Sequence, residues 1–319
     1  LQNNGVSFHP LNIINAIIVQ GGNLELVNNL AARTDVAQII ANRAIQIEDP
    51  IESPTAIPEP IGWNITMVEA PSVWSEYGVT GEGIVVSEID TGTQWDHPAL
   101  IHQYRGWDGT TADHNYNWYD PYGQSPDAPS DAHGHGTHVM GTMVGKDGDV
   151  EQIGMAPGAK WIACKGGDNV SGYLLTDELL QCTEWILAPT DLQGNNPEPS
   201  LRPNVVNNSW GGGQEDYWFT GVVDAWTAAG IFTMFSIGNA GPECSTASSP
   251  GDNWNIFSAG ASDSNDQIAS FSSRGPTLVI GNLKPDITAP GAGIRSSLPT
   301  DRYGTYSGTS MAYRMLRAQ

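Results

Sequence analysis

The sequence predicts an α/β protein in which a parallel sheet carries helices on both faces. Three observations lead to this prediction. After residue 63, short apolar runs typical of buried strands alternate with amphipathic stretches of helical length. Polar residues suited to chemistry follow several of these runs, as expected at the carboxyl edge of a parallel sheet. The length of 319 residues allows one large domain with a small companion.

The first 48 residues predict a small α+β unit. A strand over residues 13–19 is followed by a turn at Gly21-Gly22, a helix over 24–33 and extended structure over 36–47. This unit is too small to be stable by itself, so we expect it to pack on the rest of the chain. Residues 49–62 contain four prolines and several acidic residues, which predicts an extended, exposed linker open to proteases.

From residue 63 onward, strands and helices alternate along the chain. We expect the helix over 176–187 to be capped by Thr176. The predicted strands are 83–90, 160–164, 204–208 and 231–236, and the predicted helices are 176–187 and 216–229. Asp90, Ser209 and Asn239 all fall at the carboxyl ends of predicted strands.

Charge and composition exclude several classes of function. The formal net charge is -22, and the acidic residues are scattered through the chain, which argues against nucleic acid as a partner. No apolar run reaches membrane-spanning length. Of the three cysteines, Cys164 lies in a strand-like run and Cys182 in a helical one, so we expect buried free thiols and no disulfide framework.

Ser310 is the candidate nucleophile. It lies in the segment 306–312, where Gly308 and Thr309 precede it and Met311 and Ala312 follow, a pattern typical of a serine at the first turn of a buried helix. A serine hydroxyl needs a base to take its proton, a group that orients the base, and donors for the oxyanion. Taken alone, Gly-Thr-Ser is also an ordinary turn.

Asp90 and His135 are candidates for the orienting acid and the base. Asp90 ends an apolar strand, where a turn aspartate is the alternative. His135 lies in a Gly-rich loop that enters a helix. A second interpretation is a zinc site made by His133, His135 and His138 with Asp131, although no Glu follows these histidines as a metalloprotease signature requires.

Asn239 is the candidate oxyanion donor. It stands between Gly238 and Gly241, just after a predicted strand. A Gly-Asn-Ala-Gly turn without function is the alternative. Asp90, His135, Asn239 and Ser310 occur in the chain order that subtilisin has for its active-site residues.

Taken together, these segments resemble the subtilisin-like serine protease family. The similarity runs from about residue 63 to 312, and residues 186–192 and 205–211 look most like its bacillopeptidase F branch. The matching motifs are Ile89-Asp90-Thr91-Gly92, His135-Gly136-Thr137-His138-Val139, Asn208-Ser209-Trp210-Gly211, Gly238-Asn239, Phe271-Ser272-Ser273-Arg274-Gly275-Pro276, Ala289-Pro290-Gly291 and Gly308-Thr309-Ser310-Met311-Ala312.

The resemblance implies a secreted serine endopeptidase that is made as a zymogen and acts on polypeptides. It assigns His135 as base, Asp90 as the residue that orients it, Ser310 as nucleophile and Asn239 as oxyanion donor. Ser209, Trp210 and Gly211 would line the substrate strand and its pocket; Trp210 replaces the usual aliphatic residue there, which leaves specificity open.

The same resemblance divides the chain into three parts. Residues 1–48 look like a partial inhibitory propeptide, which would act as an intramolecular inhibitor. Residues 49–62 would contain the maturation cleavage. Residues 63–319 look like a catalytic domain that is incomplete at its C-terminus. Because the chain starts at Leu1, we also expect it to begin inside a longer protein, which places the signal peptide outside this sequence.

No cofactor is expected for the chemistry, and the metal content stays open. The family's strong calcium site takes a carboxylate just after a His-Pro pair, but His97-Pro98 is followed here by Ala99. The acidic loop over 146–149 could hold a structural calcium ion instead.

The tail over residues 313–319 departs from the family pattern, which continues with Pro-His-Val-Ala-Gly. Back-translated and read two bases along, this tail spells Pro-His-Val-Ala-Gly-Thr. Our hypothesis is a single-base deletion in the codon after Ala312. If the tail is real, the catalytic helix is cut short, and an inactive truncated remnant becomes an alternative beside the zinc hydrolase.

Overall fold

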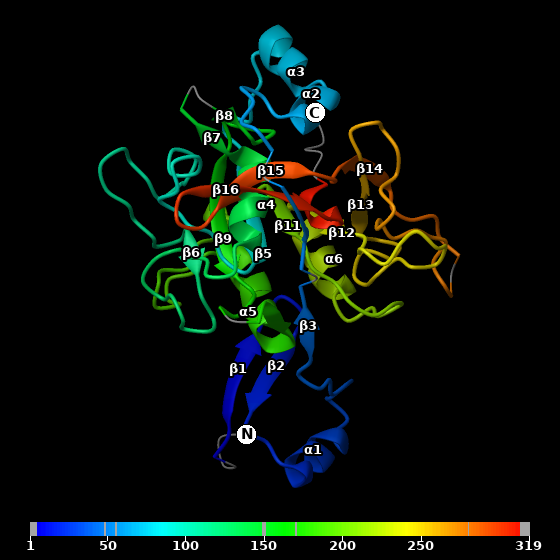
Figure 1. Cartoon of the computed structure of the whole chain (residues 1–319). Helices are drawn as coiled ribbons and strands as arrows, with labels where there is room; N and C mark the ends of the chain where they lie inside the picture. Colours follow the sequence, from blue (N-terminus) through cyan, green and yellow to red (C-terminus); the bar gives the residue numbers. More distant parts are fainter. Residues whose placement is uncertain are drawn as a thin grey trace.

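A central parallel sheet organises the computed structural model, which describes residues 5–47, 49–54, 56–148, 151–169, 171–279 and 281–312. Seven strands lie in the order β14-β13-β12-β11-β5-β9-β6, and all neighbours are parallel (Figure 1). Their bounds are β5 Val85–Asp90, β6 Trp118–Tyr119, β9 Lys160–Lys165, β11 Val205–Asn208, β12 Phe232–Ser236, β13 Phe257–Ser262 and β14 Ile287–Pro290. The predicted α/β fold is confirmed.

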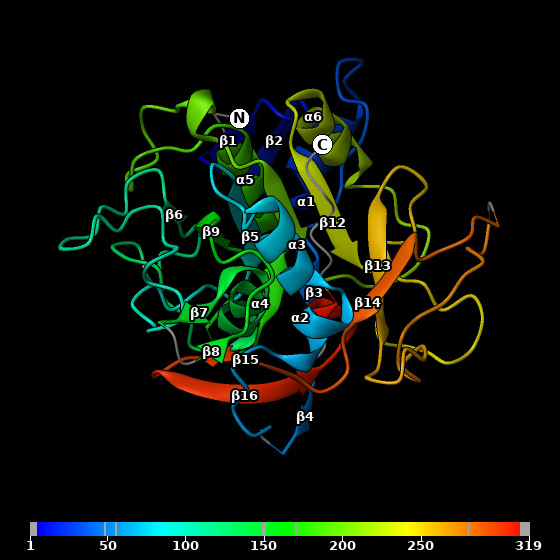
Figure 2. The ribbon, with the colours of Figure 1, turned by 90° about the horizontal axis from the view of Figure 1, so that it is seen from above.

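Helices cover both faces of this sheet because its strands are apolar on both sides. One face packs on α4 (His135–Val144), and Val86 of β5 belongs to that core. The other packs on α5 (Thr176–Leu187) and α6 (Thr220–Ala228), with Ile89 of β5 in that core. Figure 2 shows α4 on one side of the central strands and α5 and α6 on the other. Side chains alternate between these two cores along β5.

The predicted elements agree with the structure where the hydrophobic pattern was strong. Helix α5 has the predicted bounds, but the prediction of Thr176 as its cap is wrong. Leu175 is the cap residue and Thr176 is the first helical residue. The Thr176 hydroxyl donates instead to the carbonyl of Arg43, at 3.0 Å, so it is not available to the helix.

The proline-rich segment over residues 49–62 is more ordered than the extended, exposed linker that the sequence predicts. It contributes β4 (Ile51–Ser53) as an edge strand to β16 (Arg302–Ser307), which pairs on its other side with β15 (Ile294–Leu298). These three residues can pair because the prolines of the segment lie outside them, which leaves their N–H groups available. Strand β16 runs directly into the segment that carries Ser310.

The N-terminal unit packs on the rest of the chain, as predicted. It consists of β1 (Ser7–Leu11), β2 (Ala16–Gln20), α1 (Leu24–Ala31) and β3 (Ala44–Gln46). Strand β3 pairs antiparallel with β10 (Tyr173–Leu175). Near α5, the N–H groups of Asn12 and Ile13 donate to the Glu184 carboxylate at 3.1 and 2.8 Å.

The remaining elements are short. Helices α2 and α3 lie at the end of the molecule opposite to the N-terminal unit in Figure 1. No helix in the described ranges is long and apolar enough to cross a membrane. The bounds of the short elements are α2 Trp63–Met67, α3 Ala70–Tyr77, β7 Lys146–Asp147, β8 Glu151–Gln152 and the 3₁₀ turns η2 Pro199–Leu201 and η3 Thr309–Met311.

A disulfide joins Cys164 on β9 to Cys182 on α5, with the Cα atoms 5.7 Å apart. The expectation of two buried free thiols is therefore wrong. The strand and the helix each present one cysteine to the same core, and a sequence pattern cannot show that two such side chains meet. Cys244 is an exposed free thiol.

Replacing both bridged cysteines, Cys164→Ala with Cys182→Ala, should lower the free energy of unfolding by about 3 kcal/mol. The bond closes a loop between residues 18 apart, and its removal lets the unfolded chain gain entropy. Denaturant titration followed by fluorescence measures the change, with Cys244→Ser as the matched control, which should leave stability unchanged. A double variant as stable as the parent protein would contradict this stabilising role.

Candidate active site

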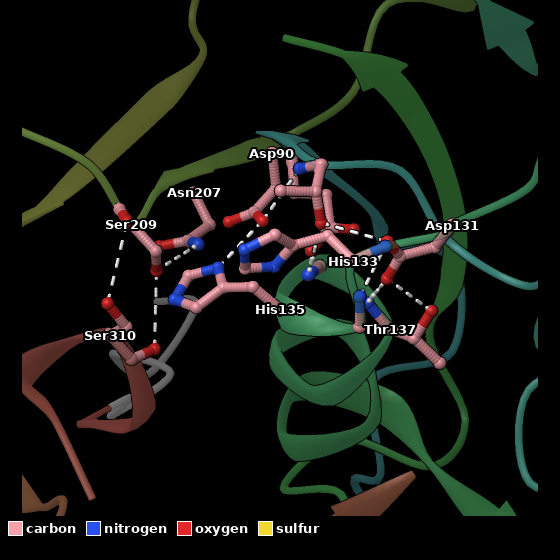
Figure 3. Close-up of polar contacts among 12 residues, drawn as sticks. Asp90, Asp131, His133, His135, Thr137, Asn207, Ser209 and Ser310 are labelled. Carbon is pink, nitrogen blue, oxygen red and sulfur yellow. Dashed lines mark hydrogen bonds and ion pairs between the residues drawn. The ribbon is translucent and has the colours of Figure 1, made fainter. Parts of the chain in front are cut away.

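Asp90 and His135 meet where the end of β5 faces the start of α4. The Nδ1 atom of His135 lies 2.7 Å from Oδ1 of Asp90, and both side chains are fully buried (Figure 3). The close approach depends on Gly136, because a Cβ atom there would lie 2.1 Å from the carbonyl oxygen of Gly92. The glycine after the histidine is therefore what lets the helix reach the strand.

The contact with Asp90 sets the state of the His135 ring. A carboxylate at Nδ1 holds the proton there and leaves Nε2 as the acceptor. That Nε2 atom is buried and has no hydrogen-bond partner among the described residues. Burial favours the neutral ring, but the charges of Asp90, Asp131 and Asp49 outweigh it and raise the pKa of His135. The ring is thus prepared to accept a proton.

Asp131 holds the start of α4 in place. Its Oδ1 accepts from the N–H groups of His133 and Gly134 at 3.0 and 2.8 Å, and its Oδ2 accepts from Thr137 N and Oγ1 at 2.9 and 2.7 Å. Thr91 extends the network, since its hydroxyl donates to Oδ1 at 3.0 Å. The sequence pattern indicates Asp131 only as a zinc ligand. A carboxylate just ahead of a helix was the signal for a capping role.

Ser310 lies in the 3₁₀ turn η3, beside Ser209 at the end of β11. Its hydroxyl donates to the Ser209 carbonyl at 3.4 Å, and the Ser209 hydroxyl donates to the Ser310 carbonyl at 3.2 Å. In Figure 3 the His135 ring lies between the Asp90 carboxylate and these two serines. The predicted continuation of this turn into a helix falls on residues 313–319, which lie outside the described ranges. The frameshift hypothesis concerns the same residues.

The remaining residues predicted for the site share one cavity with Ser310. It is open to solvent, and it brings together the predicted nucleophile, oxyanion donor and substrate-binding residues. The lining consists of Ser209, Trp210, Gly211, Ser236, Gly238, Asn239, Ser248, Thr309 and Ser310. Trp210 packs its indole edge-on against Phe219 and Phe235, with ring centroids 5.2 and 5.3 Å away, so most of this side chain belongs to the core.

Asn239 is held with its amide oxygen toward Thr309. Oδ1 accepts from the N–H and the hydroxyl of Thr309 at 2.8 and 2.9 Å. Because a main-chain N–H can only donate, this contact identifies the oxygen and leaves the amide nitrogen on the other side. The Asn239 side chain can therefore donate a hydrogen bond within the cavity it shares with Ser310.

The three histidines of the alternative zinc site have different partners. The ring of His133 is 6.5 Å from that of His135, and its Nε2 lies 3.8 Å from Asp49. His138 stacks on Tyr306 and bonds to the carbonyl of Ile294, and burial lowers its pKa to about 3. In the part of the chain that is described, no group of three His, Cys, Asp or Glu side chains could hold a metal.

The two positions considered for calcium also have protein partners. His97 Nδ1 accepts from the N–H of Ala99 at 3.1 Å. In the acidic loop, Asp147 accepts from the Tyr303 hydroxyl at 2.7 Å, and Asp149 lies outside the described residues.

Comparisons with known proteins all find members of one family. The model of the subtilase family matches residues 81–313. Bacillopeptidase F of Bacillus subtilis (strain 168) is 39% identical over 97% of this chain, which spans 22% of that protein. Serine protease AprX of the same organism is 34% identical over 73% of this chain and 55% of its own length. Subtilisin E is 33% identical over 79% of this chain and 58% of its own length. The chain thus spans less than two thirds of each of these relatives.

Proposed function

The chain belongs to the subtilase family, and from that premise we propose that it is a serine endopeptidase that cuts peptide bonds with Asp90, His135 and Ser310. The main support is the buried contact between Asp90 and His135 at 2.7 Å, next to a cavity lined by Ser310 and Asn239.

In the proposed reaction, the Ser310 hydroxyl turns from the Ser209 carbonyl to Nε2 of His135. Nε2 takes the proton as Oγ attacks the peptide carbonyl, and Asp90 stabilises the imidazolium that forms. The Asn239 amide donates to the oxyanion. His135 then gives its proton to the leaving amine, and water hydrolyses the acyl-enzyme by the same steps in reverse.

The N-terminal unit supports the zymogen part of the proposal. Strand β3 adds to β10 as an extended substrate would, and the N–H of Ile47 donates to the carbonyl of Gly172 at 3.4 Å. Asp49 then lies 3.8 Å from His133, beside the proposed base. We infer that this segment occupies the substrate path as an intramolecular inhibitor until the chain is cut between residues 48 and 62.

We also propose that the protein is secreted. The disulfide between Cys164 and Cys182 supports this location, because such bonds persist in oxidising surroundings. Polypeptides are the proposed substrates, and the preferred residue at the cut remains a matter for measurement.

A fluorophosphonate probe tests the proposed function directly. It should label the folded protein at Ser310 once the N-terminal unit has been removed, as mapped by peptide mass spectrometry, and denaturation should abolish labelling. A zinc hydrolase would instead bind zinc stoichiometrically and ignore the probe. A folded sample that takes up no probe after removal of the N-terminal unit would refute the proposal.

Asn239→Ala should lower kcat by about 10²–10³-fold with little change in KM, because it removes a donor needed in the transition state. The magnitude is the one known for the oxyanion asparagine of subtilisin itself. Steady-state kinetics on a chromogenic peptide measure it, and Thr309→Ser, which keeps a hydroxyl beside Asn239 Oδ1, is the control. A loss of less than about threefold would remove Asn239 from this role.

A further inference from the structure

Strand β5 carries a second carboxyl group, Glu88, two residues before Asp90. Residues at this spacing face the same side of a strand, so Glu88 points with Asp90 toward α4. Its side chain is fully buried, at 0% exposure. The sequence pattern predicted an apolar strand here, and neither the fold nor the proposed reaction explains a carboxyl group at this position.

Negatively charged groups outnumber positively charged ones around Glu88. Asp90 lies on the same strand, Asp131 precedes α4, and His135 starts that helix. Lys165 ends β9, where its Nζ donates to the carbonyl of Thr91, and the carboxylates of Asp120 and Asp168 also act on it. On β11 the residue paired with Glu88 is the uncharged Asn207. A third buried carboxylate beside those of Asp90 and Asp131 would be costly. Burial and the charge of Asp90 accordingly raise the pKa of Glu88 well above its ordinary 4.5.

Hydrogen bonding leaves one oxygen of each carboxyl group without a partner. Glu88 Oε1 accepts from the Thr93 hydroxyl at 2.5 Å, while Asp90 Oδ1 accepts from His135 and from the N–H of Thr91 at 2.7 Å each. The other two oxygens, Glu88 Oε2 and Asp90 Oδ2, are buried without a partner in the described part of the chain.

The two carboxyl groups also lie beside the same glycine, Gly136. Asp90 Oδ1 and Glu88 Oε1 each lie 3.1 Å from the point where a Cβ atom on Gly136 would stand. Two carboxylate oxygens cannot bond to each other, because both only accept. One proton between the groups would satisfy both orphaned oxygens at once.

We propose that Glu88 is a positioning residue that keeps a proton on Oε2 and shares it with Oδ2 of Asp90, so that a carboxylic acid holds the group that orients His135. This inference rests on the proposed function. With Glu88 neutral, the negative charge that faces the imidazolium formed on His135 during the reaction comes chiefly from Asp90 and Asp131.

The pKa of His135 reports on this arrangement without relying on activity. It can be followed by NMR of labelled histidine in the full-length protein with Ser310→Ala, which prevents self-digestion, and assigned with a His135→Gln variant. Glu88→Gln keeps a neutral donor and should shift the pKa of His135 by less than about 0.3. Glu88→Val removes the hydrogen-bond donor to Asp90. Without this donor, more of the negative charge of Asp90 acts on His135, so the pKa of His135 should rise by about one unit.

Ser87→Ala is the matched control, because Ser87 lies on the same strand but on its other face, and it should leave the pKa of His135 unchanged. If Glu88 is charged, Glu88→Gln removes a negative charge and lowers the pKa of His135 by a unit or more, which overturns the proposal. A Glu88→Val protein with the parent's pKa also overturns it.

Two further readouts keep the test decisive. If Glu88→Val does not fold, infrared spectroscopy still tests the proposal. The parent protein should show a buried protonated carboxyl group that is lost in Glu88→Gln, and its absence from the parent contradicts the proposal.

With Ser310 intact, Glu88→Val should be labelled by the fluorophosphonate at least about threefold more slowly than Glu88→Gln. A parent protein that takes no label after removal of the N-terminal unit refutes the proposed function, while the NMR result still decides the role of Glu88.

Discussion

Replacing Ser310 by alanine should lower kcat for peptide hydrolysis by about a millionfold, the loss that removal of the serine causes in subtilisin itself. Without Oγ no acyl-enzyme can form, and only the oxyanion donor and substrate binding remain to speed attack by water. Steady-state kinetics on a chromogenic peptide, with the protein concentration taken from absorbance, measure the effect. Residual activity above about 1% would mean that another group attacks the substrate.

Two variants make this result specific. Ser75→Ala changes a surface serine on α3 that bonds only locally, and it should behave as the parent protein. His135→Ala combined with Ser310→Ala should cost little more than Ser310→Ala alone, because the two residues act as one unit. Additive losses would argue that His135 and Ser310 do not work together.

Asp90→Asn should lower kcat at neutral pH by about 10⁴-fold, the loss known for this change in a serine protease triad. The amide would donate to Nδ1 of His135, which puts the proton on Nε2, where the base must accept. Kinetics over a range of pH measure the change, and Asp96→Asn, an exposed aspartate that bonds to Gln94, is the control.

The sign of the accompanying pH effect follows from the charge of Asp90. This carboxylate helps to raise the pKa of His135, and only the neutral ring can act as a base. Removing the charge lowers that pKa, so the acid limb of the profile should move to lower pH even as the maximum rate falls. An acid limb that stays in place would show that Asp90 does not set the pKa of His135.

The parallel sheet was predictable because its strands are buried on both faces and therefore form continuous apolar runs. Strands 85–90 and 205–208 stood out for this reason. Strands β13 and β14 did not, because they are rich in small residues that also occur in turns. Their place in the sheet comes from pairing with neighbours that are distant in the sequence.

The candidate site was predictable as a set of residue types in order, but its supporting contacts were not. Asp90, His135, Asn239 and Ser310 each follow a recognisable local pattern, and the structure brings them to one region. The bridge between Cys164 and Cys182 depends on which core each side chain enters. The orphaned oxygen of Glu88 likewise depends on three-dimensional neighbours.

Strand β4 gives the position of the proposed maturation cut a structural consequence. A cut before Ile51 would leave β4 in the mature enzyme as a new N-terminal anchor, paired with the strand that leads to the nucleophile. A cut after Ser53 would free that outer edge of β16, and its unpaired N–H and C=O groups could then recruit another extended peptide. The position of the cut thus decides whether β16 stays paired on both edges or has a free edge close to Ser310 at which a further extended peptide could bind.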